Sequence, residues 1–137
     1  IETVALIDEL IKKPLQYLHV SLPDFYINAY RGGDNEKPAI KLIHDRINGK
    51  LPLIGVGNLY TADQINKALN TGWAEFTALG KTAIINPNIG TLIRENRENE
   101  IETELDPDRK DKYDLGEFLW ERAKEESPLL PPLKDKK

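Results

Sequence analysis

Three short apolar runs alternate with helical segments along this sequence, and this alternation limits the fold more than any other feature. The runs cover residues 15–22, 51–57 and 75–80. Amphipathic helices are predicted between them, at residues 38–47 and 61–71. Strands that are separated by helices pair in parallel through right-handed crossovers. The sequence therefore predicts an α/β chain with a sheet of three parallel strands.

The two helices between the strands have recognisable ends. Asn48-Gly49 follows the first helix and tolerates the positive φ that a helix end often requires. Thr61 and Gln64 form a capping box at the start of the second helix, and Gly72 is predicted to end it. These signals place one helix between each pair of successive strands.

Helices are also predicted on either side of this part. Residues 2–13 carry an amphipathic pattern that is already under way at Ile1, and Asn86-Pro87 is typical of the cap and first residue of a helix. The first helix lacks an N-terminal cap, and the sequence contains no methionine. We therefore expect this chain to be part of a longer protein.

The composition changes after Glu100, where charged and proline-rich sequence replaces the alternating pattern. Within this part only residues 115–126 predict a helix, and the closing segment favours an extended polyproline conformation. We therefore expect an α/β part at residues 1–100 and a C-terminal tail, attached as an appendage, at residues 101–137.

Composition excludes several classes of function. A chain of 137 residues is within the usual range for one domain. Its net charge of -4, with both signs interspersed, argues against a nucleic-acid or anionic-membrane partner. The chain has no cysteine, and no set of metal ligands has a recognisable spacing. No apolar run approaches the ~20 residues that cross a bilayer, and no signal peptide is recognisable, so we expect a cytoplasmic protein.

Two glycines lie one residue apart at the end of the second predicted strand. Side chains alternate along a strand, so Leu53, Gly55 and Gly57 project to one face, which is bare at its C-terminal end. Glycine inside a regular element costs about 0.5–1 kcal/mol relative to alanine, and therefore needs a reason. Close approach of a ligand is the leading reason, because α/β proteins bind ligands at the C-terminal ends of their strands.

The third predicted strand ends in a similar way, with Gly80 followed by the cation Lys81. Adjacent parallel strands end side by side, so backbone donors from both ends and the lysine ammonium could surround one phosphate. A (β/α)8 barrel builds its phosphate site in this manner from the loops after its seventh and eighth strands. The candidate anion-binding residues are Gly57, Asn58, Gly80 and Lys81.

Neither strand end is strong evidence for a ligand site when taken alone. Glycines often serve only tight turns, and a lysine at a strand end is usually solvated. The spacing of the two strand ends by one βα unit favours a joint site. A Rossmann dinucleotide site fits less well, since GVGNLY lacks the third glycine of that fingerprint.

The segments LPLIGVGNLYTADQ and ALNTGWAEFTALGKTAIINPN resemble the C-terminal part of the old yellow enzyme family of FMN-dependent NAD(P)H oxidoreductases. PLIGVGN is similar to the family's seventh strand, ALGK to its eighth and YLHVS to its sixth. The resemblance covers residues 17–101, and LGEFLWE resembles the family's C-terminal tail. It implies the last three βα units of a TIM barrel, with the phosphate of FMN held at Gly57 and Gly80.

The resemblance also implies what this chain lacks. Lys81 stands where an arginine is typical, so the charge is kept while the planar, bidentate geometry is lost. A complete barrel needs about 250 residues. The family's substrate-binding histidine with its partner and its tyrosine proton donor belong to the strands that are missing here, so no catalytic residue is assigned in this chain.

The histidines and tryptophans are expected to serve the structure. A single histidine on a strand is more often a hydrogen-bonded core residue than a catalytic one, so His19 is expected in the core. His44 lies among charges on a helix and is expected at the surface. Trp73 and Trp120 are expected to be packing anchors.

Three functions stay open from the sequence. In the first, the parent protein is an FMN-dependent enzyme that takes hydride from NAD(P)H and passes it to a small-molecule electron acceptor, such as an activated alkene. This chain would then supply the phosphate site and be inactive alone. The second is a non-redox barrel enzyme that binds a phosphorylated substrate at the same rim, and the third is a non-catalytic interaction module. Unpaired sheet edges also predict self-association of the isolated chain.

Overall fold

The computed structural model describes residues 2–30, 34–125 and 130–134. They pack as two compact units, the first within residues 1–59 and 63–78 and the second within residues 60–62 and 79–137. The boundary expected after residue 100 falls inside the second unit, and the division of the protein into domains stays a prediction.

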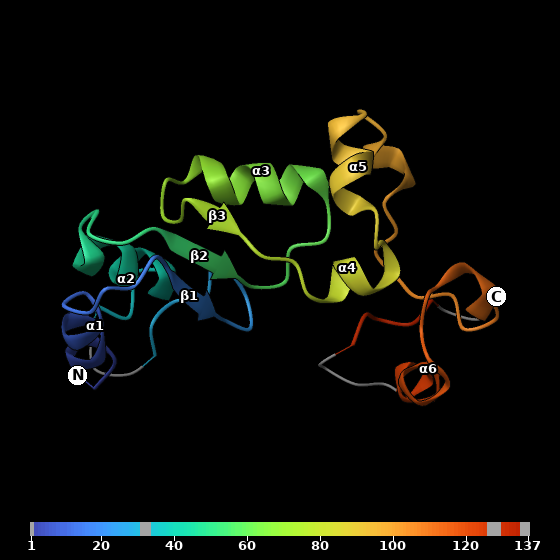
Figure 1. The fold of residues 1–137 in the computed structure, drawn as a ribbon, viewed down its shortest axis with the longest axis horizontal. Helices are drawn as coiled ribbons and strands as arrows, with labels where there is room; N and C mark the ends of the chain where they lie inside the picture. The colour runs from blue at the N-terminus through green and yellow to red at the C-terminus, as the bar shows by residue number, and fades with distance from the viewer. Residues whose placement is uncertain (1, 31–33, 126–129, 135–137) are drawn as a thin grey trace. The chain divides into compact units, whose positions relative to one another are not determined.

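The first unit is a parallel sheet with helical connections (Figure 1). Its strands are ordered β1-β2-β3, with Leu18 opposite Leu53 and Ile54 opposite Phe76. The predicted α/β order with three parallel strands is confirmed, and the sheet is consistent with part of a TIM barrel. The elements of this unit are α1 (Glu2–Leu10), β1 (Leu18–Ser21), α2 (Ala39–Ile47), β2 (Leu53–Val56), α3 (Ala62–Asn70) and β3 (Phe76–Thr77).

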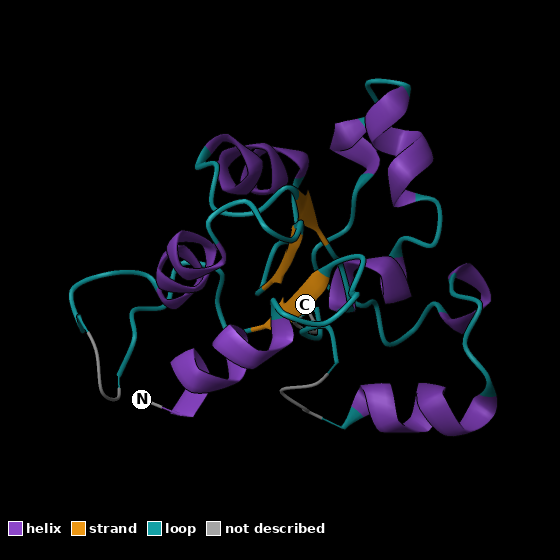
Figure 2. Cartoon of the chain, turned by 60° about the vertical axis from the view of Figure 1, so that its left-hand side comes forward, coloured by secondary structure: helices purple, strands orange, loops and turns teal. Residues whose placement is uncertain are grey.

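Among the described residues of the first unit, one face of this sheet is covered and the other is open. Along β2, Leu53 and Gly55 are buried, while Ile54 and Val56 are half-buried. Figure 2 shows α2 and α3 on one side of the strands, as two successive right-handed crossovers require. Parallel sheets are normally covered on both faces, so the face of Ile54 and Val56 is unusual in being accessible to solvent.

The open face also carries His19. This residue lies opposite Ile54 and is exposed, as is Ser21 opposite Val56. Phe76 lies on the same face and is 58% exposed. The expectation that His19 is a hydrogen-bonded core residue is therefore wrong for the first unit, because none of the described elements of this unit covers this face.

Glu75 joins the beginnings of β2 and β3. Its backbone N–H donates to the Leu53 carbonyl at 3.0 Å, and its Oε2 accepts the Leu53 N–H at 2.6 Å. Its Oε1 lies 3.7 Å from Nε2 of His44 on α2. His44 is consequently half-buried against the sheet, which corrects the expectation of a surface residue.

The ends of α2 and α3 follow the sequence signals. Asn48 and Gly49 after α2 adopt φ angles of 50° and 71°, and Gly72 after α3 adopts 68°. These are left-handed conformations that glycine and asparagine accept at low cost. The predicted helix ends are therefore confirmed.

The second unit is helical and has its own core. The rings of Tyr113 and Trp120 lie 6.1 Å apart, and Trp120 is buried, which confirms its role as a packing anchor. Residues beyond 100 supply most of this core, and their assignment to a separate C-terminal tail stays a prediction. The elements are α4 (Lys81–Ile85), α5 (Ile89–Arg94), the 3-10 turns η1 (Glu98–Glu100) and η2 (Lys110–Lys112), and α6 (Glu117–Lys124). The buried core residues are Ile85, Leu105, Tyr113, Trp120 and Ala123.

The end of the chain is attached to this core by backbone hydrogen bonds. Leu105 donates its N–H to the Pro132 carbonyl at 2.8 Å and accepts the Lys134 N–H at 2.9 Å. Residues 127–129 and 135–137 of the predicted polyproline segment lie outside the described residues, as does residue 126 at the end of the helix predicted over residues 115–126.

The chain after β3 differs from the prediction. The strand expected over residues 75–80 is only Phe76–Thr77, and a helix that was not expected, α4, begins at Lys81. Since Gly80 directly precedes α4, the candidate residues at this end lie at a helix start and not at a strand tip.

Asn86 was expected to cap the next helix, but it ends α4, and α5 begins after Asn88. The Asn86 amide nitrogen donates to the carbonyls of Thr82 and Glu102, at 3.0 and 2.8 Å. Its amide oxygen accepts the Glu102 N–H at 2.9 Å. Asn86 therefore joins α4 to the segment that carries the C-terminal core.

Asn86→Ala is expected to destabilise the second unit by about 1–3 kcal/mol, because three hydrogen bonds are lost at a buried side chain. Asn88→Ala is the matched control, since Asn88 is exposed and its side chain makes no capping bond. Chemical denaturation of both variants beside the wild type measures the difference. Equal denaturation midpoints for the two variants would contradict this role of Asn86.

Candidate functional site

The four candidate residues lie at two places in the chain. Gly57 and Asn58 follow β2 in the first unit, while Gly80 and Lys81 begin α4 in the second. Gly57 is buried, Asn58 and Gly80 are exposed, and Lys81 is half-buried. Their convergence on one phosphate stays a prediction.

The bare face of β2 is filled by the loop after β1. A Cβ atom on Gly55 would lie 2.6 Å from Cε2 of Phe25, and one on Gly57 would lie 2.3 Å from the backbone nitrogen of Phe25 and 2.5 Å from the carbonyl carbon of Asp24. The expectation that a ligand explains the missing side chains of Gly55 and Gly57 is therefore wrong. The reason is close packing of the chain on itself.

Aromatic packing holds this loop in place. Phe25 is 0% exposed, and its ring is stacked on that of Trp73, with centroids 6.5 Å apart and an angle of 9° between the planes. Tyr26 packs edge-on against both rings, at 5.1 and 6.2 Å. Trp73 is thus a packing anchor, as predicted, and its partner Phe25 is a residue that the sequence did not single out.

The backbone changes direction at the end of β2. The Val56 carbonyl accepts the N–H of Leu22 at 2.9 Å, and the next carbonyl, of Gly57, accepts the N–H of Phe25 at 3.0 Å. Asn58 then adopts a φ of 55°, a left-handed conformation that is uncommon for a residue with a side chain. The strand therefore ends in a fixed, non-extended conformation at the residues predicted to contact an anion.

The start of α4 has more space. A Cβ atom on Gly80 would meet nothing within 4 Å, and Gly80 has a φ of -93° that other residues also adopt. Its carbonyl accepts the N–H groups of Ala83 and Ile84 at 3.1 and 3.3 Å. Neither packing nor backbone conformation requires glycine here, so close approach of a ligand still fits at Gly80.

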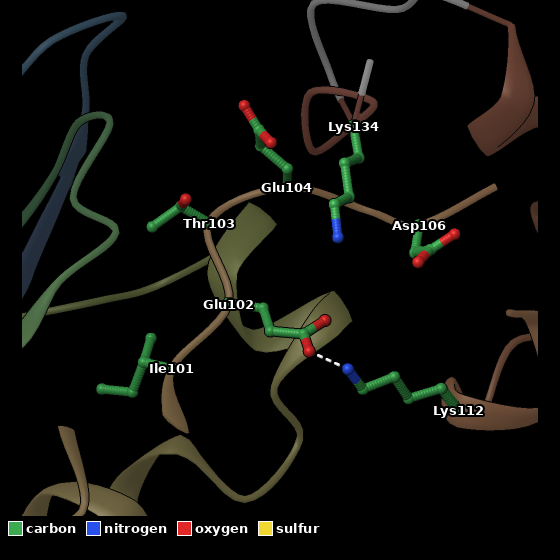
Figure 3. A pocket seen from close by; sticks show the side chains of 7 residues that line it. All are labelled: Ile101, Glu102, Thr103, Glu104, Asp106, Lys112 and Lys134. Atoms are coloured by element: carbon green, nitrogen blue, oxygen red, sulfur yellow. Dashed lines mark hydrogen bonds and ion pairs between the residues drawn. The ribbon is translucent and has the colours of Figure 1, made fainter. Parts of the chain in front are cut away.

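A polar pocket of about 240 Å³ lies in the second unit (Figure 3). None of the four predicted site residues is among the residues that line it. Its walls include Glu102, which pairs with Lys112 and accepts a hydrogen bond from the Tyr113 hydroxyl at 3.0 Å. Among the residues that the structure describes, no group of three or more acidic, histidine or cysteine side chains could hold a metal ion. Through its contacts with Lys112 and Tyr113, the carboxylate of Glu102 joins η2 to the core.

Two comparisons with known proteins bear on the function. No protein-family model matches the chain. Over 120 residues, 88% of the chain, it is 38% identical to the probable NADH-dependent flavin oxidoreductase YqiG of Bacillus subtilis strain 168. The resemblance to the flavin oxidoreductases is confirmed. The chain spans about a third of the length of this relative, 32%.

No helix among the described residues has both the length and the apolar composition needed to cross a membrane.

Gly57→Ala is expected to destabilise the first unit by about 1–3 kcal/mol, because the new methyl group overlaps the Asp24–Phe25 backbone. Gly80→Ala should leave stability nearly unchanged, since the space there is open. The melting temperatures of both variants, measured beside the wild type, compare the packing at Gly57 with that at Gly80. If Gly57→Ala has the same melting temperature as the wild type, the loop after β1 does not pack against Gly57 as described.

Proposed function

We propose that this chain is the C-terminal part of an FMN-dependent NAD(P)H oxidoreductase of the ene-reductase type, and that it contributes the site for the FMN phosphate. The identity of 38% over 88% of the chain to a probable NADH-dependent flavin oxidoreductase is the observation that carries this proposal. The parallel order of β1, β2 and β3 supports it, since it is the arrangement of successive barrel strands.

The residues at both places have groups that fit a phosphate. Asn58 is exposed at the end of β2, Gly80 leaves room for close approach, and Lys81 supplies a positive charge. A phosphate needs such backbone donors together with a cation. Gly57 contributes less directly than expected, because the loop after β1 occupies its side-chain face.

The bound flavin would supply the redox chemistry, by taking hydride from the nicotinamide and passing it to a small-molecule electron acceptor. The residues of this chain would hold the phosphate end and so fix the position of the flavin. Lys81 would do so with a point charge on a flexible stem, where an arginine would present a planar fork. The catalytic groups would come from the preceding part of the protein.

Lys81→Ala in the full-length protein is expected to weaken FMN binding by about 10- to 100-fold, the effect of losing one hydrogen bond to a charged group. Riboflavin, which lacks the phosphate, should bind equally well to both proteins. Lys67→Ala is the control, because Lys67 is an exposed cation paired with Asp63 on α3. Isothermal titration with both flavins tests the proposal, and equal losses for FMN and riboflavin would reject the phosphate site.

The isolated chain is expected to bind FMN weakly or not at all and to oxidise no NADH. The open face of the sheet and its unpaired edges should make it self-associate in size-exclusion chromatography. Tight, stoichiometric FMN binding with reductase activity would contradict the assignment as a partial barrel. A stable, ligand-free monomer would favour an interaction module, and a colourless full-length protein that retains a sugar phosphate would favour a non-redox barrel enzyme.

A further inference from the structure

We propose that Phe25 is a positioning residue for the anion site, and that its backbone N–H orients the Gly57–Asn58 peptide so that the Asn58 N–H faces the ligand. This inference rests on the proposed function, because it assigns a role within the same phosphate site. Phe25 itself would not touch the phosphate.

The hydrogen bonds along β2 show that this peptide is turned. Carbonyl groups alternate between the two neighbours of a regular strand. The Gly55 carbonyl accepts the Ala78 N–H after β3 at 3.0 Å, and the Val56 carbonyl accepts the Leu22 N–H after β1 at 2.9 Å. The next carbonyl, of Gly57, should face β3, but it accepts the N–H of Phe25, whose backbone lies on the side-chain face of Gly57.

The turned peptide directs the next N–H the other way. None of the described peptide bonds is cis, and in a trans peptide the C=O and N–H groups point in opposite directions. The Asn58 N–H therefore points away from Phe25 and from the loop that carries it. Within the described residues it meets no acceptor. In a barrel, the phosphate site lies at the C-terminal ends of the last two strands, and Asn58 follows the end of β2.

Phe25 is able to hold the peptide because the loop is rigid. Asp24 and Ile27 close a β-turn with a 3.2 Å backbone bond, and the Asp24 carboxylate accepts the Tyr26 N–H at 2.8 Å. The buried Phe25 ring packs over Gly55 and is stacked on Trp73. Moving the Phe25 N–H away from Gly57 would thus require opening the core of the unit.

Comparison of Phe25→Pro with Phe25→Ala in the full-length protein distinguishes the contribution of the hydrogen bond from that of the ring. Both lose the ring, but only proline also loses the N–H, and proline is favoured at this second position of a β-turn. The ratio of the dissociation constants for riboflavin and FMN gives the preference of each protein for the phosphate. We expect that preference to fall about tenfold in Phe25→Pro and by a clearly smaller factor in Phe25→Ala, which keeps the N–H but loses the ring that anchors it, while both variants melt earlier.

Equal preferences in the two variants would overturn the role of the Phe25 N–H while leaving the phosphate site in place. A wild-type protein that binds FMN and riboflavin equally well would instead overturn the phosphate site, and this inference with it. If neither variant folds, Asp24→Ala loosens the same turn from the exposed side. It should then lower the phosphate preference a few-fold, and an unchanged preference would count against the proposal.

Discussion

The close approach of the loop after β1 to the end of β2 is the contact on which the rest of the first unit depends. It places the ring of Phe25 where a side chain of Gly55 would lie, and the Asp24–Phe25 backbone where a side chain of Gly57 would lie. Glycine in a strand loses packing and costs conformational entropy. Here those costs are offset by a fully buried aromatic ring that stacks on a tryptophan. The glycines are therefore needed for packing before any ligand is considered.

Packing and binding need not compete at the end of β2, because they use different sides of the same backbone. The side-chain face of Gly57 and its carbonyl are engaged by the loop, whereas the following N–H is directed away from it. A peptide that is held firmly on one side is also a better donor on the other, since no reorganisation is needed when a ligand binds. The left-handed φ of Asn58 belongs to this turn, and asparagine accepts it at low cost.

Local patterns in the sequence were sufficient for most elements but not for the segments that meet across space. Alternation along β2 correctly placed Leu53 and Gly55 on one face, yet it could not show what fills that face, because Phe25 comes from a loop without any periodic pattern. The five residues of α4 are too few for a helical period, so the sequence did not predict this helix. The core around Trp120 was missed because its partners are far apart in a charged, proline-rich sequence.

The two glycines of the candidate site therefore differ in kind. Gly57 has a steric reason within the chain, so its identity says little about a ligand, whereas Gly80 has none, and the space beside it is open. If the two places form one site, as proposed, the end of β2 supplies a rigidly held donor and the start of α4 supplies room and charge. Lysine suits the second role, because an ammonium on a flexible stem needs less exact placement than a planar guanidinium. Under this proposal, binding would depend more on Asn58, Gly80 and Lys81 than on the GVG motif that first suggested the site.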